Sequence, residues 1–366
     1  MKVIQILPEL NVGGVERGTL EVAAFLVREG HEAIVISNGG RLVPALESSG
    51  ARHVRLPVHR KSLASLLQVR PLRRLLEREK PDILHIRSRA PGWIAWLAWR
   101  GMNPSTRPHL VSTVHGFYSV NAYSAVMTRG ERVIAVSESI RNYILTRYKR
   151  TRPENIVVIH RGVDPAQFPR NHRPPEAWIT EWKAAFPELT GRRILLLPAR
   201  ITRWKGQMDF LRVIRGLQDA GINVHGIIAG GAGSSKTNFE NELKEFARQS
   251  GIDQRVTFLG HRSDLREVMA VSDIVMSLSL DPEAFGRVTL EAAALGKPVV
   301  AYNHGGVAEQ LQSIFPDGLV PVGDVDEAIS RTNILLRQDP PAPGPIDSFT
   351  LQSMLEKTLS VYQNLS

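Results

Sequence analysis

Two glutamates stand eight residues apart around a Phe-Gly pair, in the segment Glu283-Ala284-Phe285-Gly286-Arg287-Val288-Thr289-Leu290-Glu291. The pattern predicts a helix that begins near Gly286 and ends before Gly296, a residue that suits a C-terminal cap. Backbone N–H groups of Gly286, Arg287 and Val288 would be free at the start of this helix. The segment therefore predicts an anion site at a helix N-terminus.

The two carboxylates fall at different places in this segment. Glu283 is expected in the loop before the helix, and Glu291 about a turn and a half inside it. Carboxylates accept hydrogen bonds from vicinal hydroxyls, so the pair could hold two sugars, a ribose and a hexose. The alternative is a solvated helix with ordinary surface glutamates.

A basic loop follows the apolar strand-like run at residues 193–197, with the sequence Pro198-Ala199-Arg200-Ile201-Thr202-Arg203-Trp204-Lys205-Gly206-Gln207. Arg200 and Lys205 could clamp a diphosphate between them, the guanidinium as a fork and the ammonium as a compact charge. Such a clamp would also stabilise charge on a departing diphosphate. The alternative is a basic surface loop.

The elements that would position these residues alternate between apolar runs and helix-period segments, which is typical of parallel α/β sheets. The first series of expected strands is residues 3–7, 33–37, 83–86, 110–114, 132–136 and 156–159, with an amphipathic helix over 15–28. The second series is 193–197, 224–229, 256–259, 274–277 and 298–301. Between them, residues 164–187 are rich in proline and have linker chemistry.

Together these patterns resemble family 4 of the retaining glycosyltransferases, over nearly the whole chain. The further segments that carry the resemblance are Gly13-Gly14, His115-Gly116, Ala135-Val136-Ser137-Glu138, Ile159-His160-Arg161-Gly162-Val163-Asp164, Gly230-Gly231-Ala232-Gly233, Phe258-Leu259-Gly260, and Gly305-Gly306 with Glu309. The resemblance implies the α/β fold called GT-B, two Rossmann-like domains with parallel sheets that face each other across a cleft. One departure is His160-Arg161, where many members have Pro-Asn.

The family resemblance implies roles for matching residues. Arg200 and Lys205 would bind the diphosphate of a nucleotide-sugar donor, Glu291 its ribose and Glu283 the transferred sugar. The remaining implied contacts are the backbone amides of Phe285, Gly286, Arg287 and Val288 with the distal phosphate, His115 beside the anomeric carbon, Gly13 and Gly14 in the cleft, and Gly260 at the nucleotide base. As a lone histidine, His115 could equally be structural.

The resemblance also implies a domain plan and a donor class. We expect an acceptor-side domain over residues 1–170, a nucleotide-sugar domain over 171–345 and a C-terminal helix over 346–366 that returns to the first domain. A UDP-sugar is the favoured donor, with GDP- or ADP-sugars as alternatives. No cofactor or metal is expected, because no histidine–carboxylate cluster has metal-ligand spacing and the family's fold works without a divalent ion.

Charge is concentrated in one half of the chain. Residues 1–180 hold 27 Lys and Arg against 14 Asp and Glu, a balance of +13, while the remainder carries −3. Much of the excess lies in residues 41–80, where Arg70, Arg73 and Arg74 would share a helix face. This predicts an anionic partner, either a membrane surface or an anionic glycolipid or polysaccharide acceptor such as lipopolysaccharide. A solvated helix face is the alternative.

Other features narrow the classes of protein. The chain has no cysteine and no signal-peptide pattern, so we expect a cytoplasmic protein, with peripheral contact to the inner membrane face as an option. Trp93, Trp96 and Trp99 would share one helix face, for core packing or for an interfacial contact. A nucleotide-sugar epimerase, a phosphorylase and a basic nucleic-acid-binding protein are the rival classes, the last opposed by the absence of a known nucleic-acid module. The oligomeric state is left open.

Overall fold

The computed structural model describes residues 1–11, 13–60, 62–231, 237–337 and 341–366. Ala232 and Gly233 of the segments named above lie outside the described residues, as do Lys61, within the basic stretch 41–80, and Pro340. The chain forms two compact units, residues 1–160 with 352–366 and residues 161–351.

Residues 161–170, which the sequence places with the first domain, contact the second unit. Val163 pairs in parallel with Thr350, and Arg266 Nη1 donates to the Gln167 carbonyl at 3.0 Å. These contacts hold the connecting segment on the second unit, which begins at Arg161.

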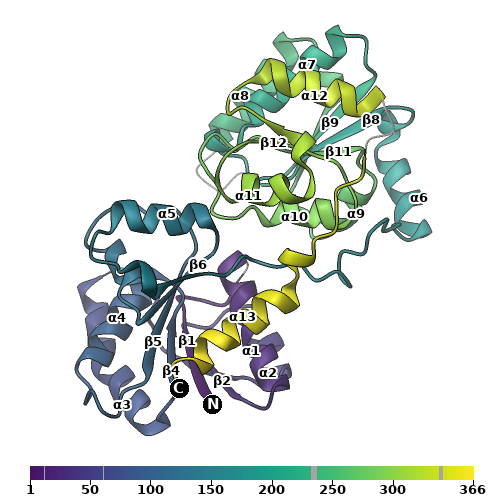
Figure 1. The fold of residues 1–366 in the computed structure, drawn as a ribbon. Coiled ribbons are helices and arrows are strands. Elements are labelled where there is room, and N and C mark those ends of the chain that lie inside the picture. The colour runs from purple at the N-terminus through teal and green to yellow at the C-terminus, as the bar shows by residue number, and fades with distance from the viewer. Residues whose placement is uncertain (12, 61, 232–236, 338–340) are drawn as a thin grey trace. The chain divides into compact units, whose positions relative to one another are not determined.

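The first unit is built on a parallel sheet with the strand order β3-β2-β1-β4-β5-β6-β7 among the described residues (Figure 1). Its strands are β1 (Lys2–Ile6), β2 (Glu32–Ser37), β3 (Arg52–Arg55), β4 (Ile83–Ile86), β5 (His109–Val114), β6 (Arg132–Ala135) and β7 (Ile156–Val158). Its helices are α1 (Gly14–Arg28), α2 (Val43–Ser48), α3 (Val69–Glu79), α4 (Arg89–Arg100), α5 (Glu138–Arg147) and α13 (Leu351–Gln363).

The C-terminal helix α13 packs in this first unit (Figure 1). The hydroxyl of Tyr362 lies 2.6 Å from His85 Nδ1, and His85 Nε2 lies 2.7 Å from the hydroxyl of Thr113. All three side chains are buried. A buried polar chain of this kind satisfies its members only in one arrangement, so it fixes the helix on β4 and β5.

The second unit has a parallel sheet with the order β10-β9-β8-β11-β12-β13 among the described residues. Its strands are β8 (Arg193–Leu197), β9 (Val224–Ala229), β10 (Val256–Gly260), β11 (Ile274–Ser277), β12 (Val299–Tyr302) and β13 (Leu319–Val320). Its helices are α6 (Glu176–Ala185), α7 (Gln207–Asp219), α8 (Thr237–Gln249), α9 (Leu265–Ala270), α10 (Arg287–Ala294), α11 (Gly305–Ile314) and α12 (Val325–Arg337). The predicted fold class, two Rossmann-like domains of the GT-B kind, is confirmed.

Strands β3 and β13 and helix α6 are among the elements that the sequence patterns did not predict. Strand β3 is a partly exposed edge strand without an apolar run, and β13 has only two residues. Helix α6 lies inside the proline-rich segment, where Trp178 and Trp182 stack with their ring centroids 5.0 Å apart. The Trp178 indole N–H donates to Asp264 at 2.8 Å, so tertiary contacts hold this helix.

In each sheet the direction of the strand order reverses at one point. The connections that leave the two strands at that point run to opposite faces of the sheet. In the second unit β8 lies between β9 and β11, so the connections that leave β8 and β11 run to opposite faces of the sheet. Ligands of open α/β sheets bind in the crevice at the carboxyl ends of such strands. The loops after β8 and β11 hold the candidate residues.

Candidate active site

The loops after β8 and β11 come together through one glycine. Gly206 has φ +74°, and a Cβ at this position would lie 1.9 Å from the carbonyl oxygen of Leu278. The neighbouring backbone is hydrogen-bonded, with the Leu280 amide donating to the Trp204 carbonyl at 2.7 Å. Only glycine permits both the positive φ and the close approach, so the sequence Lys205-Gly206 brings the lysine to the second loop.

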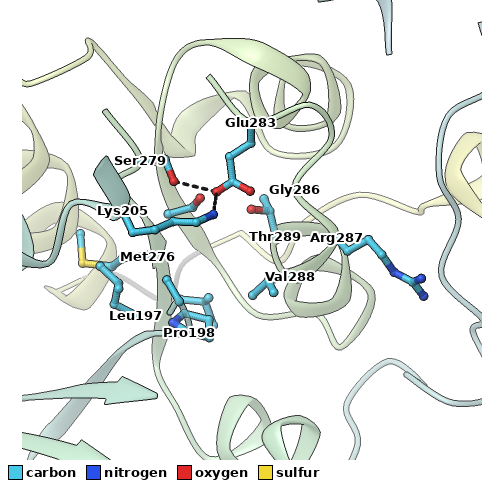
Figure 2. Close-up of a pocket in the computed structure, with 13 residues that line it drawn as sticks. Leu197, Pro198, Lys205, Met276, Ser279, Glu283, Gly286, Arg287, Val288 and Thr289 are labelled. Atoms are coloured by element: carbon cyan, nitrogen blue, oxygen red, sulfur yellow. Dashed lines mark hydrogen bonds and ion pairs between the residues drawn. The ribbon is translucent and has the colours of Figure 1, made fainter. Parts of the chain in front are cut away.

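Lys205 and Glu283 form an ion pair at this junction. The distance from Lys205 Nζ to Glu283 Oε1 is 2.8 Å, with 15% and 20% of the two side chains exposed. The hydroxyl of Ser279 donates to the same carboxylate oxygen at 2.7 Å. Figure 2 marks both contacts of Glu283 with dashed lines. Lys205 Nζ also lies 4.2 Å from the centroid of the Trp204 ring. The ammonium and the carboxylate are thus fixed beside each other and remain accessible.

The loop that carries Glu283 is hydrogen-bonded to residues at the start of α11. The Gly306 amide donates to the Glu283 carbonyl at 2.8 Å, and His304 Nε2 lies 2.7 Å from the Ser279 carbonyl. The side-chain amide of Gln310 donates to the Phe285 carbonyl. The position of the carboxylate therefore depends on the Gly305-Gly306 segment.

Helix α10 begins at the predicted place. Gly286 is its N-cap with φ +87°, and the helix runs from Arg287 to Ala294 before Gly296, whose φ is +80°. The first backbone amides of a helix have no partner within it. They open on a cavity of about 50 Å³ whose lining includes Lys205, Glu283 and Gly286 through Thr289. The Arg287 side chain extends away from the Lys205–Glu283 pair (Figure 2).

A second cavity of about 330 Å³ adjoins the first, and the two share Pro198, Ala199, Lys205 and Val288. Arg200, Gly230, Gly231, His261 and Arg262 also line it. A Cβ at Gly230 would lie 2.0 Å from the Ala199 carbonyl oxygen, so this glycine lets the loops after β8 and β9 pack closely. The two cavities together offer cations and helix amides to an anionic ligand beside a carboxylate that can accept hydroxyl hydrogen bonds.

Not every predicted residue lines these cavities. Phe285 is buried and packs near Phe349, with ring centroids 6.2 Å apart. Glu291 lies within α10, where its Oε1 is 3.8 Å from Arg287 Nε, and it lines neither cavity. Gly260 ends β10 with φ +65° directly before His261, and a Cβ there would meet nothing within 4 Å.

The remaining predicted residues belong to the first unit. Gly13 precedes α1 and Gly14 begins it, after β1. His115 follows β5 directly, and its backbone amide donates to the Tyr118 hydroxyl at 3.1 Å. All three stand at loops after the carboxyl ends of strands, the usual ligand edge of such a sheet.

Sequence patterns missed several residues of the site. Ser279 and His304 each contribute to the site through one hydrogen bond, and no sequence motif predicts either of these bonds. His261 and Arg262 directly follow the predicted Gly260, so their place after a strand was a usable signal. Among the described residues no group of three or more His, Cys, Asp or Glu could hold a metal ion. In that same part of the chain, no helix is long and apolar enough to cross a membrane.

Comparison with protein families identifies two domains that match the two Rossmann-like series. Residues 12–167 match the model described as Glycosyltransferase Family 4, and residues 179–343 match Glycosyl transferases group 1. The chain belongs to the family 4 glycosyltransferases.

Individual relatives agree with this membership. The glycosyltransferase chain is 29% identical over 286 residues to D-inositol 3-phosphate glycosyltransferase of Mycobacterium marinum, an alignment that covers 73% of this chain and 58% of the relative. The chain spans less than three fifths of the length of the curated relatives it first matches.

Solved structures match over the full chain. A glycosyltransferase from Rickettsia africae superposes with a TM-score of 0.86 at 28% identity, covering 100% of this chain and 98% of that one. An Anabaena protein in complex with UDP and glucose has the same fold, with a TM-score of 0.79 at 21% identity and 99% coverage of both chains.

Proposed function

We propose that this protein transfers a hexose or N-acetylhexosamine from a nucleotide diphosphate sugar to a glycan or glycolipid, with retention at the anomeric carbon. The observation that carries the proposal is the Lys205–Glu283 ion pair of 2.8 Å at the N-terminus of α10. The pair combines an ammonium suited to phosphate with a carboxylate suited to hydroxyl groups, where the strand order reverses. A sugar bonded to a diphosphate presents those two groups side by side.

In this proposal the donor diphosphate lies between Arg200, Lys205 and the amides of Gly286, Arg287 and Val288. Three N–H groups on Lys205 allow it to keep one hydrogen bond to Glu283 while it binds phosphate oxygens. The nucleoside would extend into the larger cavity towards Gly260, with its ribose at Glu291. Glu291 is buried beside Arg287 and lines neither cavity, so its contact with the ribose is proposed from the family resemblance. A UDP-sugar is the preferred donor, supported by the UDP in the Anabaena structure.

The transfer step needs no covalent enzyme intermediate. The acceptor hydroxyl oxygen forms the new bond to the anomeric carbon on the face from which the diphosphate leaves. The bond from that carbon to the phosphate oxygen breaks, and the phosphate oxygen takes the hydroxyl proton. Arg200, Lys205 and the helix amides stabilise the negative charge on the leaving group. Glu283 orients the hexose, and His115, Gly13 and Gly14 are the residues of the first domain that we propose for the same reaction.

The acceptor is proposed from charge. The balance of +13 in residues 1–180 favours an anionic glycolipid or polysaccharide, such as lipopolysaccharide, at the inner face of a membrane. On the first unit, Arg70 and Arg74 are exposed on α3 while Arg73 is partly covered. The exposed pair would contribute to attraction toward that surface. The first domain would thus hold the acceptor and the second the donor.

The test is to incubate the protein with UDP-sugars, with and without a glycolipid acceptor, and to follow both sugar and product by NMR. We expect an α-linked product from an α-linked donor, formed only when the acceptor is present. A β-linked product would contradict retention. Conversion of the donor sugar without an acceptor would instead support an epimerase, and a requirement for inorganic phosphate would support a phosphorylase.

A further inference from the structure

The first unit contains a second concentration of positive charge at an open pocket of about 800 Å³. Six basic side chains line it: Arg100, Arg129, Arg147, Lys149, Arg150 and Arg152. No acidic residue lines the pocket. Glu154, which follows in the same loop, is exposed and is not part of the lining. The residues that line the pocket therefore supply no negative charge to balance its six basic side chains.

These six side chains have no carboxylate partner among the described residues, as is also true of several other basic residues of the unit. Arg17, Arg52 and Arg141 of the same unit, by contrast, pair with glutamates. The pKa of Arg129 is lowered, first by burial and then by the like charges of Arg100 and Arg150. Like charges that repel each other at one pocket favour the binding of an anion, because it relieves the repulsion.

Aromatic side chains position part of this charge. The guanidinium carbon of Arg129 lies 4.2 Å from the ring centroid of Trp96 and 4.9 Å from that of Trp93. The guanidinium carbon of Arg100 lies 5.1 Å from the ring centroid of Trp96. Stacked guanidinium groups lose less conformational freedom when they bind an oxyanion than freely moving ones do. The tryptophans on α4 thus serve a basic pocket as well as the core.

Within the first unit, the topology separates this pocket from the residues proposed for sugar transfer. Arg100 ends α4 and leads toward β5, Arg129 lies just before β6, and residues 147–155 connect α5 to β7. All three segments therefore lie toward the amino ends of β5, β6 and β7. The residues proposed for sugar transfer in this unit, such as His115, lie at the carboxyl ends. None of the six basic residues of the pocket is therefore among the residues proposed for the transfer step.

We propose that the pocket lined by these six residues is a binding site for a ligand with two or more phosphate groups. Arginine binds phosphate oxygens in a bidentate manner, and several cations around one pocket select a multiply charged ligand over a single phosphate. The same chemistry occurs in a soluble polyphosphate and in a phosphate-bearing lipid headgroup layer. The proposal stands independently of the function of the second unit.

The test uses isothermal titration of tripolyphosphate into the full chain. Arg200 and Lys205 are first changed to Gln, so that the candidate donor site does not contribute. In this background we compare the added pair R150Q/R152Q with R70Q/R74Q, which removes the same charge from exposed positions on α3. We expect R150Q/R152Q to weaken binding at least about tenfold, from the loss of charge-assisted hydrogen bonds, and R70Q/R74Q less than about threefold.

Two results would overturn the proposal: equal weakening by both pairs, which would indicate only the general field of the unit, or no measurable binding in the background protein. Circular dichroism checks that the exposed substitutions leave the fold intact. Sedimentation with phosphatidylcholine vesicles, with and without phosphatidylglycerol, separates the sources of the ligand. Loss of phosphatidylglycerol-dependent binding in R150Q/R152Q supports a lipid headgroup, and unchanged vesicle binding with lost tripolyphosphate binding supports a soluble anion.

Discussion

Replacement of Lys205 by Met removes the ammonium that pairs with Glu283 at 2.8 Å and keeps most of the apolar volume over Trp204. Glu283 retains its hydrogen bond from Ser279 and is 20% exposed, so water can reach the abandoned carboxylate. Breaking a fully buried pair costs about 3–5 kcal/mol, and an exposed one about 0–1 kcal/mol. For this partly exposed pair we expect a loss of about 1–2 kcal/mol in the free energy of unfolding.

The expected effect on catalysis is larger. Loss of one preorganised donor to developing charge costs about 2.7–4 kcal/mol of transition-state stabilisation, or a factor of about 10²–10³ in kcat. Since the unfolding free energy falls by less, the protein stays folded while its turnover drops. Both quantities are measured on one preparation, by urea unfolding and by initial rates at saturating donor.

Lys244→Met is the matched control for this experiment. Lys244 also pairs with a glutamate, Glu240, at 2.6 Å, and also lies near an aromatic ring, 5.4 Å from the centroid of Phe258. It lines neither candidate cavity. We expect K244M to keep turnover within about twofold, since exposed pairs contribute little. Wild-type turnover in K205M, or an equal loss in K244M, would refute the role given to Lys205.

Three further predictions address the scaffold, the pH dependence and the metal. Gly206→Ala should lower the free energy of unfolding by about 2 kcal/mol more than Gly221→Ala in urea unfolding, because both have φ +74° but only Gly206 faces the Leu278 carbonyl; equal losses would contradict the close-approach argument. Burial and then nearby Arg192 lower the pKa of His225 from 6.5 to about 4. Its protonation therefore favours the unfolded chain, and stability should fall by about 2 kcal/mol between pH 6.5 and 4.5 in the wild type, with a smaller fall in His225→Gln. An unchanged pH profile in that variant would exclude the histidine as the cause. Turnover should persist in excess EDTA, and a loss that magnesium restores would contradict metal independence.

The sequence was informative about the fold wherever strands were apolar. Strands buried on both faces, such as β8 and β11, form continuous hydrophobic runs that can be read directly. The edge strand β3 has the sequence Arg-His-Val-Arg and a partly exposed surface, so no periodicity marked it. Helix α6 was not predicted because its segment is rich in proline. Its stability comes from the packing of Trp178 and Trp182, which a local pattern does not show.

The candidate site was predictable in part. The start of α10 at Gly286 and the places of Arg200 and Lys205 after β8 follow from turn and cap chemistry that local sequence determines. The pairing of Lys205 with Glu283 joins residues 78 positions apart and depends on the strand order. A linear pattern does not contain that order. The support from Ser279 and His304 likewise depends on how α11 packs behind the loop.

The proposed binding of a nucleotide sugar by Arg200 and Lys205 is tested most directly by thermal unfolding. The wild type and R200A/K205A are each unfolded with UDP, GDP and ADP and with their sugars. A ligand that binds only the folded state stabilises it by RT ln(1 + [L]/Kd), so at a fixed concentration the tightest ligand raises the midpoint most. The account predicts that one nucleoside diphosphate, with UDP preferred, raises the midpoint of the wild type and leaves that of R200A/K205A unchanged. Failure of every nucleotide to stabilise the wild type, or equal stabilisation of the variant, would contradict it.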